Sequence, residues 1–361
     1  NSKFIPVTQQ FLVDYRRGWK IWAIYAYDDH PQANAQKIFN FCGNHRQFTT
    51  DGGTPCGNIS GLAVAMQPRV VHYMYSVPFE VARIEDPDAK YYTALRFAVA
   101  DDVGSITTAN PSTLLHLAQL SDRYQDSLIR DVSDGTISQD FEIESEIRQV
   151  LMRRLSRKRR RARQLEQIAE RTGRLRPRDM WPQMRMLAIW TGGSCASYLD
   201  SVREAFGDVP TRDHGLSASE GRMTIPMEDN TPDGVLDISA HYYEFVPVEE
   251  YETRHPTVLE AHELEIGRDY YILLTTSSGF YRYDICDVVR CTGHCGTTPM
   301  LRFLHKGAHI ANITGEKLSE SQIVESVRES SVRLRLGIDT FTAMPAWGQP
   351  PGYRLAIEQA D

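Results

Sequence analysis

The sequence of 361 residues is poor in the features that mark specialised protein classes. Its six cysteines are too few for a disulfide framework at this length, which favours a reducing compartment, the cytosol. It has no apolar run of about 18 residues, so we expect no membrane span. Its 40 basic and 47 acidic residues give a net charge of -7. That balance disfavours a globally basic nucleic-acid-binding protein.

Several common catalytic and binding motifs are also missing. There is no Gly-x-Ser-x-Gly elbow, no Walker loop and no dinucleotide-binding glycine signature. Cys286, Cys291 and Cys295 lie near His294, but their spacing is not the paired Cys-x-x-Cys type, which disfavours a zinc site.

Short apolar runs alternate along the chain with segments of helical character, a pattern that favours the α/β class. We expect helices within residues 11–41 and over 111–120, and a strand or helix over 91–100. Strands are expected over residues 70–77, 242–248 and 270–276, and over 186–190 before the turn Thr191-Gly192-Gly193-Ser194. A helix over 320–332 and extended runs near 341 and over 353–358 suggest a second, small α+β domain, incomplete here.

The most basic segment of the chain runs from Arg153 to Arg163 and has two interpretations. It is either a phosphate-binding surface for nucleic acid or anionic lipid, or the solvated face of a long helix. Apolar residues at helical spacing and acidic residues flank it, and no aromatic stacking residues interrupt it, so the solvated helix is favoured.

Two loops have the composition of phosphate-binding segments. Asn1-Ser2-Lys3 precedes an apolar stretch and resembles the end of a phosphate loop, because small residues let backbone N–H groups reach phosphate oxygens. Gly215–Arg222 surrounds Glu220 with small residues, and a single carboxylate there suits Mg²⁺. A surface lysine and a polar turn with a solvated glutamate are the alternatives, and composition alone favours them.

Two further segments follow. In residues 278–289, Asp287 stands beside β-branched residues at a strand, where a carboxylate can accept hydrogen bonds from a ribose diol. A hairpin with a capping aspartate is the alternative. In residues 306–320, two glycines with lysines suggest a hinge between domains, against an ordinary loop with Ser319 as a helix cap.

The order of these segments resembles the adenylate-forming superfamily and, within it, the Gretchen Hagen (auxin-responsive promoter) family of acyl acid–amido synthetases. The resemblance runs over nearly the whole chain. The segments that carry it are Ser2–Thr8, Ser217-Ala218-Ser219-Glu220-Gly221, Tyr242-Tyr243-Glu244-Phe245-Val246-Pro247 and Gly279-Phe280-Tyr281-Arg282-Tyr283 with Asp287-Val288-Val289. The wording Ala-Ser-Glu-Gly-Arg is more similar to bacterial members than to plant ones.

The resemblance implies a large domain of β-sheets packed with helices over residues 1–305, a hinge over 306–315 and the start of a small mobile domain over 316–361. It implies two reaction steps with ATP and Mg²⁺. A small carboxylic acid is adenylated with release of pyrophosphate, and the acyl group then passes to an amine, expected to be that of an amino acid. A thiol acceptor is the first alternative, and a nucleic-acid-binding protein using Arg153–Arg163 is the second. The resemblance implies no nucleic-acid or membrane partner and leaves the oligomeric state open.

The resemblance also implies roles for individual residues. Ser2 and Lys3 would end the phosphate loop, and Gly192 and Gly193 would lie near the adenine. Ser217, Ala218 and Ser219 would line the nucleotide, Glu220 would hold Mg²⁺, and Asp287 would bind the ribose with Arg282 and Tyr283 shaping its strand. Lys306 would act at the hinge, so that Lys3, Glu220 and Lys306 are the expected catalytic residues.

This sequence departs from the plant pattern at three of these positions. Leu216 replaces a tyrosine, Cys286 a glycine and Lys306 an arginine, which keeps charge but loses bidentate geometry. The family pattern places the core of the phosphate loop before Asn1 and a late lysine beyond Asp361. Arg69 and Arg96 are candidates for binding the acyl carboxylate.

Overall fold

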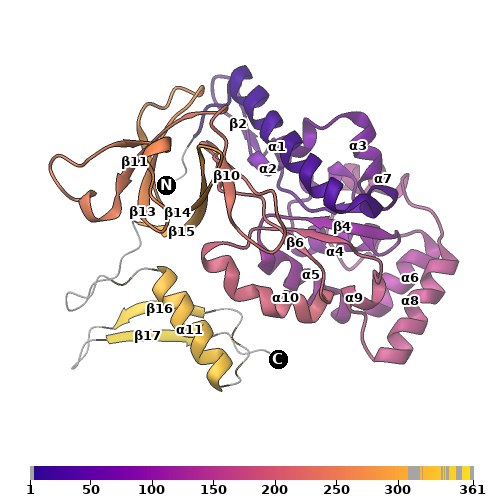
Figure 1. The fold of residues 1–361 in the computed structure, drawn as a ribbon. Coiled ribbons are helices and arrows are strands. Elements are labelled where there is room, and N and C mark those ends of the chain that lie inside the picture. Colours follow the sequence, from indigo (N-terminus) through magenta and orange to yellow (C-terminus); the bar gives the residue numbers. More distant parts are fainter. Residues whose placement is uncertain are drawn as a thin grey trace. The chain divides into compact units, whose positions relative to one another are not determined.

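The computed structural model describes residues 4–307, 318, 320–334, 336, 338, 341–346 and 352–357. The chain divides into two compact units (Figure 1). Unit 1 comprises Asn1–Tyr25, Trp190–Asp200 and Asp213–Asp361, and unit 2 comprises Ala26–Ile189 and Ser201–Arg212. Two helices, α1 (Gln9–Asp29) and α10 (Leu199–Phe206), contain residues of both units.

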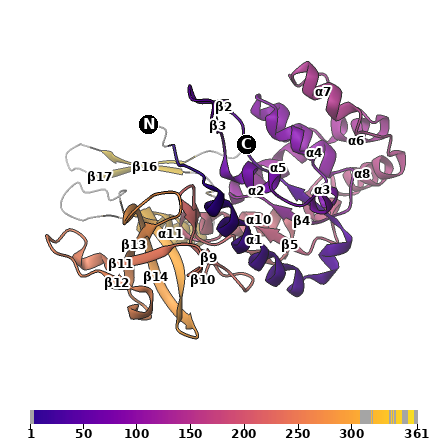
Figure 2. The same cartoon turned by 90° about the horizontal axis from the view of Figure 1, so that it is seen from above.

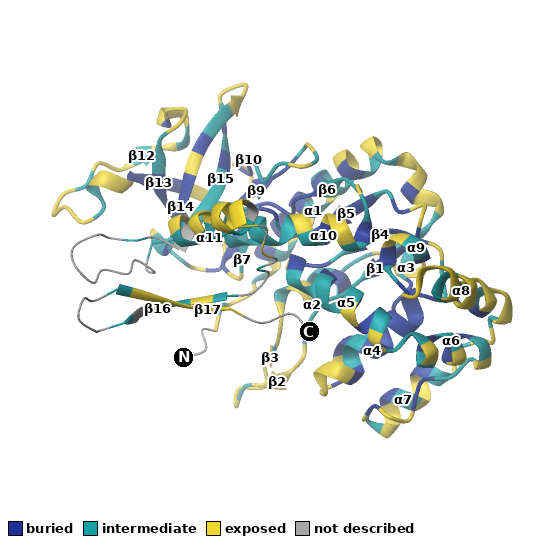
Figure 3. Cartoon of the chain, turned by 90° about the horizontal axis from the view of Figure 1, so that it is seen from below, coloured by how far each residue is buried: buried dark blue, intermediate teal, exposed yellow. Residues whose placement is uncertain are grey.

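Unit 2 is built on a parallel sheet with the strand order β1-β4-β5-β6. Every residue of β5 is buried, as are all but the last of β4, so both faces of the sheet are covered, as parallel sheets require (Figure 3). The strands are β1 (Lys37–Asn40), β4 (Val103–Thr107), β5 (Met186–Ala188) and β6 (Thr211–Arg212), with a separate hairpin of β2 (Phe48–Thr49) and β3 (Pro55–Cys56).

Local sequence sets the ends of the unit 2 helices. Asp86 and Asn110 cap α4 and α5 by accepting backbone N–H groups, and proline occupies the first position of each helix. Gly135 and Gly173 end α6 and α8 in the left-handed conformation. The helices are η1 (Pro31–Ala35), α2 (Ile59–Ala65), α3 (Arg69–Met74), η2 (Phe79–Arg83), α4 (Pro87–Ala98), α5 (Pro111–Arg123), α6 (Gln125–Asp134), α7 (Ser145–Met152), α8 (Arg159–Thr172) and α9 (Pro177–Met180).

Unit 1 contains a seven-stranded antiparallel sheet with the order β12-β11-β13-β14-β15-β10-β9. Its core packs Phe245 of β11 against Tyr270, Ile272 and Leu274, which lie at every second position of β13 and so point to the same face. The strands are β9 (Thr224–Ile225), β10 (Gly234–Leu236), β11 (Tyr242–Pro247), β12 (Leu259–Glu260), β13 (Asp269–Thr275), β14 (Tyr283–Cys295) and β15 (Thr298–Lys306).

Shorter elements complete unit 1. The strands β16 and β17 pair antiparallel and are drawn side by side in Figure 2. The elements are η3 (Gly193–Tyr198), β7 (Ser217–Ala218), β8 (Gly221–Arg222), η4 (Val248–Glu250), η5 (Ala261–Glu263), α11 (Glu320–Leu334), β16 (Phe341–Ala346) and β17 (Gly352–Ile357). The expected order of one helix and then two strands is confirmed here. No helix of the described residues is long and apolar enough to cross a bilayer.

One expected strand is wrong. Residues 69–74, within the segment predicted as a strand over 70–77, form the helix α3. Pro68 occupies the N-cap position, and Val70 and Tyr73 are 68% and 79% exposed at a spacing of three residues. Helical periodicity therefore overrides the strand preference of the β-branched residues. Only Tyr75 pairs with the sheet, through a single parallel bridge to Ile38.

The basic segment is also organised differently from the long helix that we expected. Its first part, Arg153 to Lys158, lies between two helices, since α7 ends at Met152, whereas Arg159 to Arg163 form the start of α8. Arg154 pairs with Glu80, and Lys158 pairs with Asp101. Arg161 donates to the carbonyls of Val99 and Met180 at 2.8 and 2.9 Å. Part of the positive charge is therefore used to join helices within unit 2.

The predicted domain limits remain predictions. Of the expected hinge over residues 306–315, only 306 and 307 lie within the described residues. The two compact units divide residues 1–305 further, because both contribute residues to that range.

Candidate active site

The strands β14 and β15 bring Asp287 and Lys306 together as register partners. The ammonium group of Lys306 forms an ion pair with the Asp287 carboxylate and donates to the carbonyl of Ile285 at 3.2 Å. Asp287 is only 3% exposed, whereas the Lys306 side chain keeps partial access to solvent. Two residues singled out from separate sequence segments thus form one cation–carboxylate pair.

The turn of the β7–β8 hairpin carries a third predicted residue, whose negative charge acts on Asp287. Glu220 lies in that turn between Ala218 and Gly221, and it is buried rather than solvated. The solvated-glutamate alternative is therefore wrong. The negative charges of Glu220 and Asp284 act on Asp287. Two further carboxylates and one ammonium group thus influence the buried Asp287.

Burial is the largest influence on Asp287, and it raises the pKa of that carboxyl group because the charged form loses water. The Lys306 ammonium lowers the same pKa, but Glu220 and Asp284 raise it further through like-charge repulsion. The net pKa shift of Asp287 is upward. A cation or a hydrogen-bond donor brought to this region would therefore be stabilising.

An unusual backbone conformation lies immediately before Asp287. Cys286 has a φ of 58°, which favours glycine, and the family pattern places a glycine at this position. The strain is held by two hydrogen bonds: Cys286 N–H donates to Asp284 at 2.6 Å, and its carbonyl accepts from Gly307 N–H at 2.7 Å. The bend thus ties the end of β15 to the segment that presents Asp287.

The predicted Gly192-Gly193 turn packs against β15. A side chain at Gly193 would place its Cβ 2.9 Å from the ring of Phe303 and 3.2 Å from the carbonyl oxygen of Leu304, and its φ is 57°. Glycine is therefore required by both space and conformation. The turn lies beside the strand that ends at Lys306, so this prediction joins the same region of unit 1.

Sequence reasoning missed Asp213, which organises this turn. Its carboxylate accepts from Thr191 Oγ1 at 2.8 Å, from Thr191 N–H at 2.5 Å and from Gly215 N–H at 2.6 Å. Burial raises its pKa to about 6, against the lowering effect of these hydrogen bonds. Asp213 thereby fixes both the glycine turn and the start of the loop that carries Ser217 to Glu220. The only signal for it in the sequence was its place between two glycine-containing segments.

Arg222 was also missed, although it directly follows the Glu220 loop. It is 1% exposed, and all three guanidinium nitrogens lack a hydrogen-bond partner. Its guanidinium lies 4.3 Å from the centre of the Trp19 ring, in space left by Gly18 on α1. Burial lowers its pKa to about 10. No spacing in the sequence distinguishes this arginine from a surface one.

Four further predicted residues lie on neighbouring strands and turns of unit 1. Tyr283 begins β14 and packs on the core, its ring 4.5 Å from that of Phe280. Arg282 donates through Nε to both oxygens of Glu244 at 2.9 Å. Ser217 and Ala218 form β7, which leads into the Ser219-Glu220 turn.

Ser2 and Lys3 lie outside the described residues. The segment that follows them is anchored at Thr8, whose hydroxyl caps α1 by accepting from Phe11 N–H at 3.1 Å. The same hydroxyl donates to the carbonyl of Ser277, also at 3.1 Å. This bond ties the N-terminal segment to the loop that leads into β14, the strand of Asp287.

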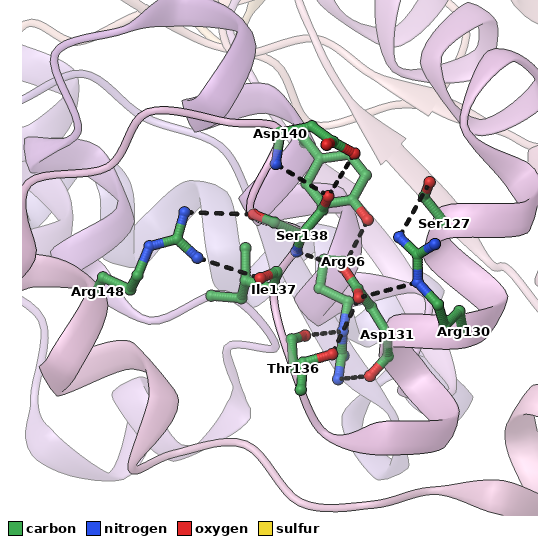
Figure 4. Close-up of polar contacts among 10 residues, drawn as sticks. Arg96, Ser127, Arg130, Asp131, Thr136, Ile137, Ser138, Asp140 and Arg148 are labelled. Carbon is green, nitrogen blue, oxygen red and sulfur yellow. Dashed lines mark hydrogen bonds and ion pairs between the residues drawn. The ribbon is translucent and has the colours of Figure 1, made fainter.

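Arg96, a candidate for binding the acyl carboxylate, forms hydrogen bonds within the fold instead (Figure 4). It is fully buried and donates to the carbonyls of Thr136 and Asp131 at 2.9 and 2.7 Å. Arg69, the other candidate, is an exposed residue at the start of α3. Neither geometry favours the role that we considered.

No group of three or more His, Cys, Asp or Glu side chains in the described part of the chain is arranged to hold a metal ion.

Comparisons with known proteins agree with the resemblance. The model of the GH3 family N-terminal domain matches residues 1–211, and that of the GH3 family central domain matches residues 234–306. A jasmonoyl–L-amino acid synthetase of Nicotiana attenuata is 22% identical over 97% of this chain and 63% of its own length. An indole-3-acetic acid-amido synthetase of Oryza sativa subsp. indica is 26% identical over 48% of this chain and 30% of its own length.

A solved acyl acid amido synthetase has the same fold. It superposes with a TM-score of 0.86 at 18% identity, over 98% of this chain and 64% of the solved one. A second structure, of an acyl acid amido synthetase in complex with 2,4-DB, gives a TM-score of 0.84 at 19% identity, over 98% and 63%. The chain therefore spans just under two thirds of the relatives that it matches most fully.

Proposed function

The chain belongs to the GH3 family, and we propose that the protein containing it is an ATP-dependent acyl acid–amido synthetase. In the first step, a carboxylate oxygen of a small acid attacks the α-phosphorus of ATP, and pyrophosphate leaves. In the second step, an amine attacks the acyl carbon, and AMP leaves. We expect the amine to be that of an amino acid, since the related proteins are named for amino-acid conjugation.

The observation that carries this proposal is the convergence of Glu220, Asp287 and Lys306. These residues come from three separate segments of the sequence. Asp287 pairs with Lys306, and the negative charge of the buried Glu220 acts on Asp287, which supports the proposal. Repulsion from Glu220 and Asp284 opposes the ionised form of Asp287. A bound nucleotide, with its cation and its hydroxyl groups, would stabilise this arrangement.

Each residue of the cluster has a proposed task. Asp287 accepts the ribose hydroxyl groups, and Lys306 keeps that carboxylate ionised while facing the nucleotide. The Gly192-Gly193 turn leaves space for the adenine. Glu220 fits Mg²⁺, because a buried carboxylate within reach of another negative charge benefits from a divalent cation. When bound, Mg²⁺ neutralises charge on the phosphates.

The phosphate-loop roles of Ser2 and Lys3 complete the proposal from the sequence side. The anchoring of Thr8 to Ser277 supports them, since it brings the chain after Lys3 to the loop before β14. The six cysteines, all free thiols, are compatible with a cytoplasmic location, which we also propose.

The test of the proposed function is carboxylic-acid-dependent exchange of pyrophosphate into ATP by the full-length protein. We expect exchange with one class among aromatic, indole, fatty and jasmonate-like acids, followed by amide formation when amino acids are added. Exchange with thioester formation on coenzyme A, and no amide with any amino acid, would favour the thiol-acceptor alternative. ATP binding without exchange for any acid would contradict the proposed reaction.

A variant pair tests the role of Glu220. Glu220→Gln is expected to lower the exchange rate at least about tenfold and to raise the Mg²⁺ concentration needed for half-maximal rate, because the carboxylate charge is lost. Glu228→Gln, an exposed position on the following loop, is the matched control and should change neither quantity. An unchanged Mg²⁺ dependence in Glu220→Gln would rule out the metal role.

A further inference from the structure

A tyrosine outside the predicted site segments contacts the part of β14 that presents Asp287. Tyr251 directly follows η4, and its hydroxyl group donates to Asp284 Oδ2 at 2.5 Å. The same hydroxyl oxygen lies 3.9 Å from the sulfur of Cys286. Both contacted residues come shortly before Asp287 in the chain. Tyr251 therefore reaches β14 at the place where its backbone bends.

The ring of Tyr251 is held independently of its hydroxyl group. It stacks on the ring of Tyr271 in β13, with the ring centres 3.6 Å apart and the planes inclined by 13°. Tyr271 is itself buried, so it gives the Tyr251 ring a fixed support. Burial raises the pKa of Tyr251, and the hydrogen bond to Asp284 raises it further. The hydroxyl group therefore keeps its proton and acts as the donor.

The carboxylate of Asp284 connects this tyrosine to the bend. Its Oδ2 accepts from Tyr251, and its Oδ1 accepts from the backbone N–H of Cys286 at 2.6 Å. Because both oxygens belong to one planar group, the bond from Tyr251 sets the direction in which Oδ1 faces the backbone. Asp284 is only partly buried, so without that bond its carboxylate would be free to turn towards water.

The stacked tyrosines also meet the end of β15. A Cβ at Gly307 would collide with the hydroxyl end of the Tyr271 ring, so only glycine fits at this position. The N–H of Gly307 donates to the carbonyl of Cys286 at 2.7 Å. The backbone of Cys286 is thus held on both sides, by Asp284 at its N–H and by Gly307 at its carbonyl.

This double attachment matters because the left-handed conformation of Cys286 is unfavourable for a residue with a side chain. Such a conformation persists only where the surrounding structure holds it. If Cys286 returned to a negative φ, the chain direction would change immediately before Asp287. The Asp287 carboxylate would then leave its place beside Lys306.

We propose that Tyr251 and Asp284 are positioning residues that hold Cys286 in its left-handed conformation and thereby aim the Asp287 carboxylate at the nucleotide ribose. The identity of that ligand rests on the proposed function. Glycine at position 286 would adopt the same conformation without cost. A chain with cysteine at this position therefore depends on the Tyr251 hydroxyl group more than a chain with glycine would.

The experiment combines Tyr251→Phe, which keeps the stacked ring, with Cys286→Gly in the full-length protein. Tyr251→Phe should weaken ATP binding, measured by calorimetry, by about fivefold or more, because the strained conformation loses its support. In the Cys286→Gly background the same substitution should weaken ATP binding by less than about twofold. In pyrophosphate exchange, Tyr251→Phe should raise the KM for ATP and leave the KM for the acid unchanged.

The matched control is Tyr242→Phe. It also removes a hydroxyl group that donates to a carboxylate of the same sheet, that of Glu260 at 3.2 Å. That pair has no contact with the Cys286 bend, so ATP affinity should stay at the parent value. Crystal structures of the nucleotide-free variants test the bend without ATP: residue 286 should leave the left-handed region in Tyr251→Phe and keep it in Tyr242→Phe.

The outcomes separate this inference from the proposed function. If the parent binds ATP, then equal affinity in Tyr251→Phe, or a loss that Cys286→Gly does not reduce, would overturn the inference and leave the proposed function standing. An unchanged φ at Cys286 in Tyr251→Phe would also overturn it. A parent that binds no ATP would contradict the proposed function, and loss of the bend in Tyr251→Phe would still confirm that the tyrosine holds Cys286.

Discussion

Two buried carboxylates, Asp131 in unit 2 and Asp287 in unit 1, have nearly the same exposure but opposite surroundings. Asp131 accepts hydrogen bonds from Tyr92 Oη at 2.7 Å, Thr136 Oγ1 at 2.9 Å and Ser138 N–H at 2.6 Å (Figure 4). Asp287 has the ammonium group of Lys306 on one side and two further carboxylates nearby. Asp131 therefore has hydrogen-bond donors around it. Asp287, by contrast, is attracted by one ammonium group and repelled by two carboxylates.

The difference separates Asp131, which supports the fold, from Asp287, for which we propose a role in binding. The donors around Asp131 come from α4 and from the loop after α6, and Asp131 itself lies on α6. Its hydrogen bonds therefore hold these three segments together. Burial and like-charge repulsion both act against the ionised form of Asp287, which costs folding free energy, and we propose that a bound ligand offsets this cost. The two arginines Arg96 and Arg222 repeat the contrast, since only Arg96 donates to backbone carbonyls.

The largest expected effect is on the Asp131 network. Asp131→Ala leaves three donors, two of them buried, without an acceptor, and we expect the free energy of unfolding to fall by about 3–5 kcal/mol. Urea unfolding measures the loss, with Asp134→Ala, an exposed position on the same helix, as control. A loss below about 1 kcal/mol would contradict the conclusion that the hydrogen bonds of Asp131 stabilise the fold.

The pH dependence of stability tests Asp213. Its pKa is about 6 in the folded chain, above the ordinary aspartate value, so the folded state binds this proton more tightly than the unfolded state. The carboxyl group therefore costs stability progressively as the pH rises from about 4 to 6, by about 2–3 kcal/mol. Unfolding measured across this range should show the parent losing stability relative to Asp213→Asn. Parallel curves for the two proteins would contradict the raised pKa, and Asp208→Asn serves as an exposed control.

At Asp287, binding rather than stability is expected to change. Asp287→Asn removes a repelling charge, so we expect the free energy of unfolding to change by less than about 1 kcal/mol. Affinity for ATP, measured by calorimetry, should fall about tenfold or more. Asp269→Asn removes the carboxylate of a cross-strand pair with Arg290 on the same sheet, and it should leave ATP affinity unchanged. An unfolded Asp287→Asn protein would assign this residue to the same class as Asp131.

The smallest effect is expected at Arg222. Arg222→Met removes a guanidinium group that makes no hydrogen bond and returns the cost of its burial, while losing the contact with Trp19. These terms oppose each other, so the free energy of unfolding should stay within about 1 kcal/mol of the parent. Arg96→Met, measured in the same urea titrations, should lose several times more. Equal losses would remove the distinction between the two arginines.

Much of the fold could be predicted from local patterns. The helix caps Asp86 and Asn110, the buried run before Thr191 and the aromatic strands of unit 1 all follow rules of spacing and turn chemistry. Residues 69–74 could not be predicted, because their β-branched composition favours a strand and only the exposure of Val70 and Tyr73 reveals the helix. The break at residues 153–158 was equally hidden, since the spacing of apolar residues continues across it.

The sequence by itself determined the family, the residue types of the candidate site and the glycines that its turns require. It also determined that Glu220, Asp287 and Lys306 were worth considering, although each had an ordinary alternative. Only the tertiary structure decided that Asp287 pairs with Lys306, that Glu220 is buried and that Arg96 belongs to the framework. The physical reason is that charge and spacing are local properties of a chain, whereas hydration and neighbouring charges are set by residues far apart in sequence.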